Sequence, residues 1–306
     1  MPETEGLLSL PNGRALAWVE GGVPDGYPVF GLHGTPGCRY NRMLDESAYS
    51  QAGNRYITTD RAGHGHSTRN RGRTVATEVA DVLAVADFLS IDRFSVVGGS
   101  GGGPHALACA ALLADRVDRV ACQSSLAPLG QDGMTRAEWL DGMDPEIAAE
   151  LAWAEAGEEV LFQEMETAQR LMQQRVEEEP GRLMGDEASE GDVAFLQRPE
   201  VVAAFRRIVR EQARHGVSGS VDDTIAFTTS WGFSLRGVQV PVLLTYGTED
   251  SSCPVSHGRF LARQLPTAQV HEVTGEGHFA RDPQREVLAT HQWLHDGGDW
   301  VYLDSK

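Results

Sequence analysis

One pentapeptide, Gly98-Gly99-Ser100-Gly101-Gly102, constrains this chain more than any other feature. It follows the apolar run 94–97, which is typical of a buried strand, and it precedes a helix-like stretch from Pro104 to Ala114. In such a strand–turn–helix setting, the serine of G-x-S-x-G sits on a sharp, strained turn that exposes its hydroxyl. The residues two before and two after it must be small so that strand and helix can approach, and both are glycines here. The pattern therefore predicts Ser100 as a nucleophile.

A serine nucleophile needs a histidine as base, and in this setting the histidine comes last in the chain, after an acid. His278 lies in the glycine-flanked loop 275–279, directly after the strand-like run 269–273. His271 lies inside that run and His291 lies inside a helix-like segment, so both are expected to be structural. The loop position predicts His278 as the base.

The acid should follow the preceding strand, which we expect at 240–246. Two acids compete in the next loop, Glu249 and Asp250. The spacing G-x-x-D-x-x-x-P favours Asp250, because Pro254 then ends the loop before a helix. Asp250 would hold the tautomer of His278 and stabilise its cation.

Acyl transfer also needs donors for an oxyanion. One is expected to be the backbone N–H of Gly101, directly after the nucleophile. The second should lie where the strand-like run 28–32 enters His33-Gly34-Thr35-Pro36-Gly37. Pro36 has no N–H, so Thr35 or Gly34 must donate, and we favour Thr35.

Taken together, these motifs resemble the α/β-hydrolase-fold serine hydrolases. Residues 33–37 resemble the H-G-x-P-G loop of that family, and Asp60-Arg61-Ala62-Gly63-His64-Gly65-His66-Ser67 is similar to its D-x-x-G-x-G-x-S turn. The resemblance implies a cofactor-free hydrolase that cleaves a carboxylic ester or related acyl bond of a small molecule. Its implied triad is Ser100, Asp250 and His278, with Thr35 and Gly101 as the oxyanion hole.

Other functions fit the same motifs. Proline iminopeptidase-like aminopeptidases resemble the chain in the H-G-x-P-G loop, but they usually carry tryptophan where this sequence has Gly101. Biosynthetic cyclases, lyases and thioesterases keep the same triad. A non-catalytic ligand-binding protein of this fold is the remote alternative. Haloalkane dehalogenases and epoxide hydrolases are disfavoured, because they resemble the fold with aspartate in place of Ser100.

The remaining pattern predicts the architecture. An edge hairpin is expected at 7–10 and 15–20, and further strands are expected near 28–32, 55–59, 94–98, 118–123, 241–246 and 269–273. Helices are expected near 75–90, 104–114, 255–264 and 283–296. This alternation predicts a doubly wound, mostly parallel α/β sheet with its site at the carboxyl ends of the strands.

An insertion interrupts this alternation. Residues 128–236 contain no strand-like run and carry a net charge of −12 out of −18 for the chain. Helices are expected within 144–179, 200–214 and 221–231. We therefore expect an α/β core at 1–127 and 237–306 and a helical cap at 128–236 that lies over Ser100.

Composition limits the partners. The charge of −18 argues against nucleic acid and anionic membranes and favours a neutral or apolar acyl substrate. The 306 residues contain no apolar run near 18 residues, and the acidic start 1–5 differs from a basic signal peptide, so a cytoplasmic protein is expected.

His64 and His66 lack further ligands for a metal site. The cysteines, expected to be free buried thiols, are Cys38, Cys109, Cys122 and Cys253.

Overall fold

The computed structural model describes residues 4–43 and 45–302, so the first three residues of the expected acidic start lie outside the described residues. Within the described residues, eight strands form one sheet in the order β1-β2-β4-β3-β5-β6-β7-β8. The strands are β1 (Thr4–Ser9), β2 (Ala15–Gly22), β3 (Tyr27–Leu32), β4 (Asn54–Thr59), β5 (Phe94–Gly99), β6 (Val117–Gln123), β7 (Val242–Gly247) and β8 (Ala268–Val273). β1 pairs antiparallel with β2, and β2 pairs antiparallel with β4. All other neighbours are parallel.

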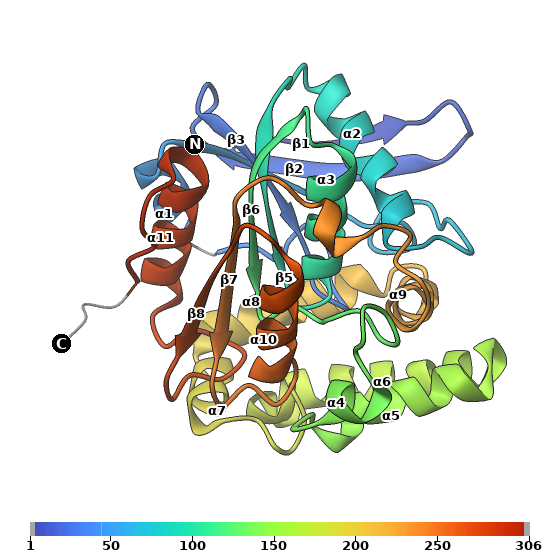
Figure 1. The fold of residues 1–306 in the computed structure, drawn as a ribbon. Helices are drawn as coiled ribbons and strands as arrows, with labels where there is room; N and C mark the ends of the chain where they lie inside the picture. The colour runs from blue at the N-terminus through green and yellow to red at the C-terminus, as the bar shows by residue number, and fades with distance from the viewer. Residues whose placement is uncertain (1–3, 44, 303–306) are drawn as a thin grey trace.

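The sheet is covered by helices on both faces, as Figure 1 shows. Side chains of a strand alternate between the two faces. Val96 of β5 therefore packs in the cluster that holds α2 (Val79–Phe88), α3 (Gly102–Leu112) and α10 (Val255–Gln264). Its neighbour Val97 packs in a second cluster with α1 (Ser47–Gln51) and α11 (Pro283–Asp296). Burial on both faces explains why the central strands are continuously apolar in sequence.

The predicted doubly wound sheet is confirmed by this topology. The expected hairpin is β1 and β2, and the four expected core helices correspond to α2, α3, α10 and α11. The start of the first of these helices, Ala76–Glu78, is a 3₁₀ turn (η1). The short helix α1 was not predicted, because five residues are too few to show a helical period.

Six helices lie between β6 and β7, and we call α4 to α9 the inserted helices. They are α4 (Arg136–Leu140), α5 (Pro145–Ala156), α6 (Glu158–Glu178), α7 (Glu190–Leu196), α8 (Pro199–Gln212) and α9 (Ser218–Thr228). Two further 3₁₀ turns are η2 (Pro180–Arg182) and η3 (Leu235–Gly237). Figure 1 shows α4, α5, α6 and α7 gathered beyond one end of the sheet. The sequence predicted the longer inserted helices but not α4 and α7, which span only five and seven residues.

None of the helices in the described part of the chain is long and apolar enough to cross a membrane. The four cysteines, all of which the structure describes, are buried free thiols. Burial raises the pKa of the Cys109 and Cys122 thiols above their ordinary range. These side chains therefore act as small apolar residues in the core.

Candidate active site

Ser100 lies on the turn between β5 and α3. Its φ of 53° is in the left-handed region, which a non-glycine residue adopts only when its surroundings hold it there. A Cβ on Gly98 would overlap the carbonyl oxygen of Gly102, and a Cβ on Gly102 would overlap that of Leu32. Both flanking glycines are therefore required by backbone contacts, which is the local geometry that the pentapeptide predicted.

The structure brings His278 and Asp250 together at the ends of β8 and β7. The Nδ1 of His278 lies 3.0 Å from Oδ2 of Asp250 and 3.2 Å from Oδ1. The backbone N–H groups of Ser252 and Cys253 donate to Oδ1 of Asp250 at 2.8 and 2.9 Å. Glu249, the competing acid, is exposed. The loop thus presents Asp250 to the histidine and leaves Nε2 of the ring available.

Electrostatics reinforce this pair. Burial by itself would raise the pKa of Asp250, but His278 and the backbone donors hold it below its ordinary value. Burial by itself would lower the pKa of His278, but Asp250, followed by Asp192 and Glu286, raises it above its ordinary value. Asp250 is therefore a carboxylate whose charge favours protonation of the neighbouring ring.

Ser100 and His278 line one cavity of about 750 Å³. Gly34 and Thr35 also line it, and a Cβ on Gly34 would lie 3.2 Å from the Cβ of Ser100. The inserted helices and their connections line it mostly with apolar side chains, together with Arg198, Glu200 and Gln212; the apolar ones are Met172, Leu183, Met184, Phe195, Val201, Phe205, Ile208 and Val209. A cavity of this size, lined by apolar side chains on the inserted-helix side and by many polar and charged residues elsewhere, suits a small organic ligand.

The two expected oxyanion donors lie side by side. A Cβ on Gly101 would come within 2.7 Å of Oγ1 of Thr35. The hydroxyl of Thr35 is already engaged, because it donates to Oδ2 of Asp223 at 2.6 Å. Its backbone N–H is therefore the group that can serve a bound oxyanion, together with the N–H of Gly101 at the start of α3.

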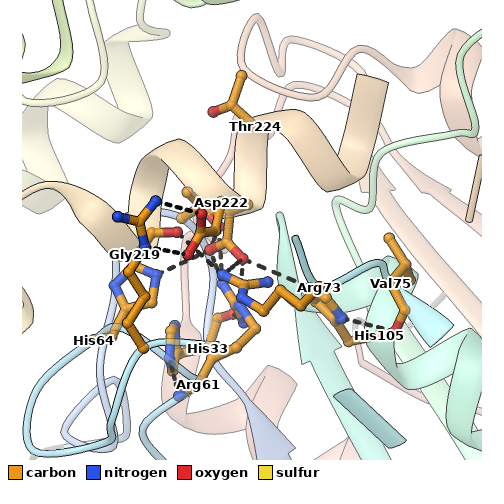
Figure 2. Close-up of polar contacts among 12 residues, drawn as sticks. His33, Arg61, His64, Arg73, Val75, His105, Gly219, Asp222 and Thr224 are labelled. Carbon is orange, nitrogen blue, oxygen red and sulfur yellow. Dashed lines mark hydrogen bonds and ion pairs between the residues drawn. The ribbon is translucent and has the colours of Figure 1, made fainter. Parts of the chain in front are cut away.

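A buried charge network holds the loop that carries Thr35 (Figure 2). Arg61 donates to the carbonyl oxygen of His33 at 2.7 Å and to Oδ1 and Oδ2 of Asp223 at 2.7 and 2.5 Å. Arg73 donates to Oδ1 of Asp223 at 2.5 Å, and Nε2 of His64 lies 3.0 Å from its Oδ2. Asp223 belongs to the inserted helix α9, so this network joins an inserted helix to the oxyanion loop.

The buried network favours an ionised Asp223 and a neutral His33. Burial would raise the pKa of Asp223, but the Arg61 and Arg73 guanidinium groups hold it well below its ordinary value. Burial, followed by the charge of Arg61, lowers the pKa of His33 well below its ordinary value. Neutral His33 accepts the backbone N–H of Arg61 at Nε2, 3.0 Å away, and its Nδ1 lies 2.7 Å from the carbonyl oxygen of Gly34.

The histidine pair of the D-x-x-G-x-G-x-S turn has acidic partners from the inserted helices. His64 contacts Asp223, and His66 lies 3.3 Å from Glu211. Among the residues that the structure describes, no group of three or more His, Cys, Asp or Glu side chains is arranged to hold a metal ion. The turn acts as a junction between core and inserted helices.

Sequence reasoning missed three neighbours of the site. Cys253, whose Sγ lies 3.9 Å from Oγ of Ser100, was expected only to pack. Asp192 accepts the backbone N–H groups of His278 and Phe279, each at 2.8 Å, and Asp223 anchors the oxyanion loop. Both aspartates lie in an acidic segment in which no local pattern separates a buried carboxylate from an exposed one.

Comparison with known proteins agrees with this architecture. A family model described as alpha/beta hydrolase fold matches residues 27–282. The proline iminopeptidase of Xanthomonas citri is 28% identical over 308 residues, which cover 92% of this chain and 93% of that protein. The 2-hydroxymuconate semialdehyde hydrolase of Pseudomonas putida is 26% identical over 270 residues, which cover 87% of this chain and 85% of that protein.

A solved structure gives the same result at the level of the fold. The alpha/beta hydrolase fold protein from Chitinophaga pinensis matches with a TM-score of 0.67 and 20% identity, over 95% of this chain and 97% of that one. The sequence relatives support hydrolase activity for this chain. On the strength of the family match across most of its length, the chain belongs to the α/β hydrolase fold family.

Proposed function

We propose that this protein is a serine hydrolase that cleaves the carboxylic ester or related acyl bond of a small apolar compound through Ser100, His278 and Asp250. The observation that carries the proposal is the pairing of Nδ1 of His278 with Asp250 at 3.0 Å, in a ring that lines the same cavity as the strained Ser100. A histidine that a carboxylate orients and that shares a cavity with a serine hydroxyl is the arrangement that can activate this hydroxyl.

The chemistry follows from these positions. Oγ of Ser100 attacks the acyl carbon while Nε2 of His278 takes its proton, and the N–H groups of Thr35 and Gly101 stabilise the oxyanion. The histidine then gives the proton to the leaving alcohol, and the acyl group stays on Ser100. A water molecule, deprotonated by the same histidine, attacks the acyl-enzyme, and the acid leaves with Ser100 restored.

The cavity wall and the charge of the chain favour one class of substrate. Its inserted-helix side is mostly apolar, with side chains such as Met172, Phe205 and Ile208 lining the cavity that Ser100 also lines. The chain carries a net charge of −18, which disfavours the approach of anionic compounds. A neutral ester with an apolar acyl group fits both observations.

A second candidate is an aminopeptidase of the proline iminopeptidase type. The observation in its favour is the 28% identity with such an enzyme along 92% of this chain. The carboxyl groups of Glu200, Glu276 and Glu286 also line the cavity and would attract a substrate amine. An aminopeptidase of this kind would use the same triad on an amide bond.

Two steps test the proposal. First, a fluorophosphonate probe is applied to the wild type, Ser100→Ala, His278→Ala and the exposed-histidine control His215→Ala, and the adduct is located by peptide mapping. We expect one adduct, on Ser100, in the wild type and the control only. Labelling that persists in Ser100→Ala, or a wild type that does not react, would contradict the proposal.

Second, kcat/KM is measured for neutral p-nitrophenyl esters of increasing acyl length and for prolyl-naphthylamide. Faster turnover of the esters, rising with apolar length, supports the ester hydrolase. Faster turnover of the prolyl amide would replace it with the aminopeptidase.

A further inference from the structure

The loop that carries His278 is held by a carboxylate from the inserted helices. The N–H of His278 donates to Oδ2 of Asp192 at 2.8 Å, and the N–H of Phe279 donates to Oδ1 at 2.8 Å. Asp192 lies in α7 and is 2% exposed. Two hydrogen bonds to one buried carboxylate fix both the position and the orientation of the backbone at His278.

The loop is shaped to accept this carboxylate. A Cβ on Gly277 would overlap Oδ2 of Asp192 and Oγ of Ser189. Ser189 caps α7 by accepting the N–H of Asp192 at 3.1 Å. The close approach between α7 and the loop therefore depends on the missing side chain at Gly277.

An apolar contact accompanies the polar one. The ring of Phe279 packs 4.8 Å from that of Phe195 in α7 and 6.1 Å from that of Phe205 in α8. Phe279 thereby joins the hydrophobic cluster of the inserted helices rather than a cluster of the core. The residue next to His278 is thus packed as part of the inserted helices.

We propose that Asp192 is a positioning residue that couples the inserted helices to the base of the active site: its carboxylate sets where His278 lies and adds negative charge beside the ring. The proposal rests on the proposed function, because it treats His278 as the base. It adds that an inserted helix completes the catalytic geometry as well as lining the cavity.

The charges that face His278 come from three elements. Asp250 follows β7, Asp192 belongs to α7 and Glu286 belongs to α11. Burial lowers the pKa of His278, and these three carboxyl groups raise it. Removal of the Asp192 charge should therefore lower the pKa of His278, while removal of its hydrogen bonds should displace the ring. A residue that only stabilised the fold would do neither of these in a folded variant.

The test compares Asp192→Asn with Glu190→Gln, which removes the same charge from an exposed position of the same helix. The rate constant for fluorophosphonate labelling of Ser100 is measured from pH 5 to 9. For Asp192→Asn we expect a plateau about 10-fold lower, because small displacements of catalytic groups are costly. We also expect its rise with pH to shift to lower pH, whereas Glu190→Gln should match the wild type. The His278 pKa is measured independently by NMR on ¹³C-histidine-labelled protein.

A second variant separates charge from packing. Phe195→Leu weakens the apolar contact but leaves the carboxylate in place, so we expect a lower plateau without a shift in the His278 pKa. An unchanged rate profile and His278 pKa in Asp192→Asn would overturn the proposal. A lower plateau without any shift in that variant would assign Asp192 a purely structural role and would overturn it as well.

The NMR measurement distinguishes the two proposals. If wild-type Ser100 does not react with the probe, the proposed function fails, and the inference is then judged from the His278 pKa alone. A lower pKa in Asp192→Asn would still support the coupling, and an equal pKa would overturn it.

Discussion

Asp250 and His278 are the two residues on which the proposed base depends. The carboxylate accepts two backbone N–H groups at Oδ1, so Oδ2 faces the ring from a fixed position. Such a carboxylate selects the ring tautomer with hydrogen on Nδ1, which leaves the lone pair of Nε2 for the serine proton. Glu249, the neighbouring acid in the same loop, is exposed instead.

We expect Asp250→Asn to lower kcat for ester hydrolysis by about 10³–10⁴-fold. The amide presents an N–H group to Nδ1 and so favours the wrong tautomer of His278. The matched control is Glu249→Gln, which should keep the wild-type kcat. Retention of more than about a tenth of the activity in Asp250→Asn would argue against its role.

The pH dependence follows from the pKa of His278. The base acts only when the ring is neutral, and its surroundings raise its pKa above the ordinary 6.5. Labelling of Ser100 should therefore increase with pH and reach half of its plateau above about pH 6.5. Rate constants measured in buffers of constant ionic strength check this, and a midpoint below pH 6 would contradict it.

At the scale of elements, the turn between β5 and α3 depends on close contact between the backbone of the turn and the backbone of the neighbouring strand β3. Gly102 packs against the carbonyl oxygen of Leu32 in β3, so α3 begins directly against the neighbouring strand. Gly99 lies in the same glycine run, but a Cβ there would meet only the carbonyl oxygen of Gln123 at 3.9 Å. The turn therefore requires a glycine at position 102 but has room for a side chain at position 99.

We expect Gly102→Ala to lower the free energy of unfolding by about 3 kcal/mol, because backbone must shift to admit the methyl group. Gly99→Ala should change it by less than about 0.5 kcal/mol. Urea denaturation followed by circular dichroism measures both. Equal stability of the two variants would mean that the turn relaxes more easily than its contacts imply.

At the scale of the whole molecule, buried charge joins the inserted helices to the core. Asp223 of α9 is the shared partner of Arg61 and Arg73, and the side chains of all three are at most 2% exposed. Arg39 makes a second link of this kind, because it contacts Asp60 at 2.6 Å and Glu211 of α8 at 2.9 Å. These contacts join segments that are far apart in sequence.

We expect Asp223→Asn to lower the free energy of unfolding by about 3–5 kcal/mol, because two buried guanidinium groups lose their counter-charge. Its neighbour Asp222 pairs with Arg69, which is 30% exposed, so Asp222→Asn should cost about 1 kcal/mol. Urea denaturation of both variants provides the comparison. A loss at position 223 no larger than that at 222 would show that the network contributes little.

The sequence alone predicted the features that depend on neighbours along the chain. The strands follow from short apolar runs, the elbow follows from glycines two residues either side of Ser100, and the choice of Asp250 over Glu249 follows from the spacing to Pro254. Each of these patterns is local, because a turn or a buried strand requires particular residues at fixed offsets. The fold class was predictable for the same reason.

Only the tertiary structure decided which charges of the acidic insertion are buried and what they contact. Asp192 meets the N–H of a residue 86 positions away, and Asp223 meets Arg61 across 162 positions, while Glu190 in the same segment as Asp192 is exposed. A carboxylate has the same local signature in both situations. The packing of α7 and α9 against the loops of the core determines which group each carboxylate contacts. The spacing of residues along the chain does not predict that packing.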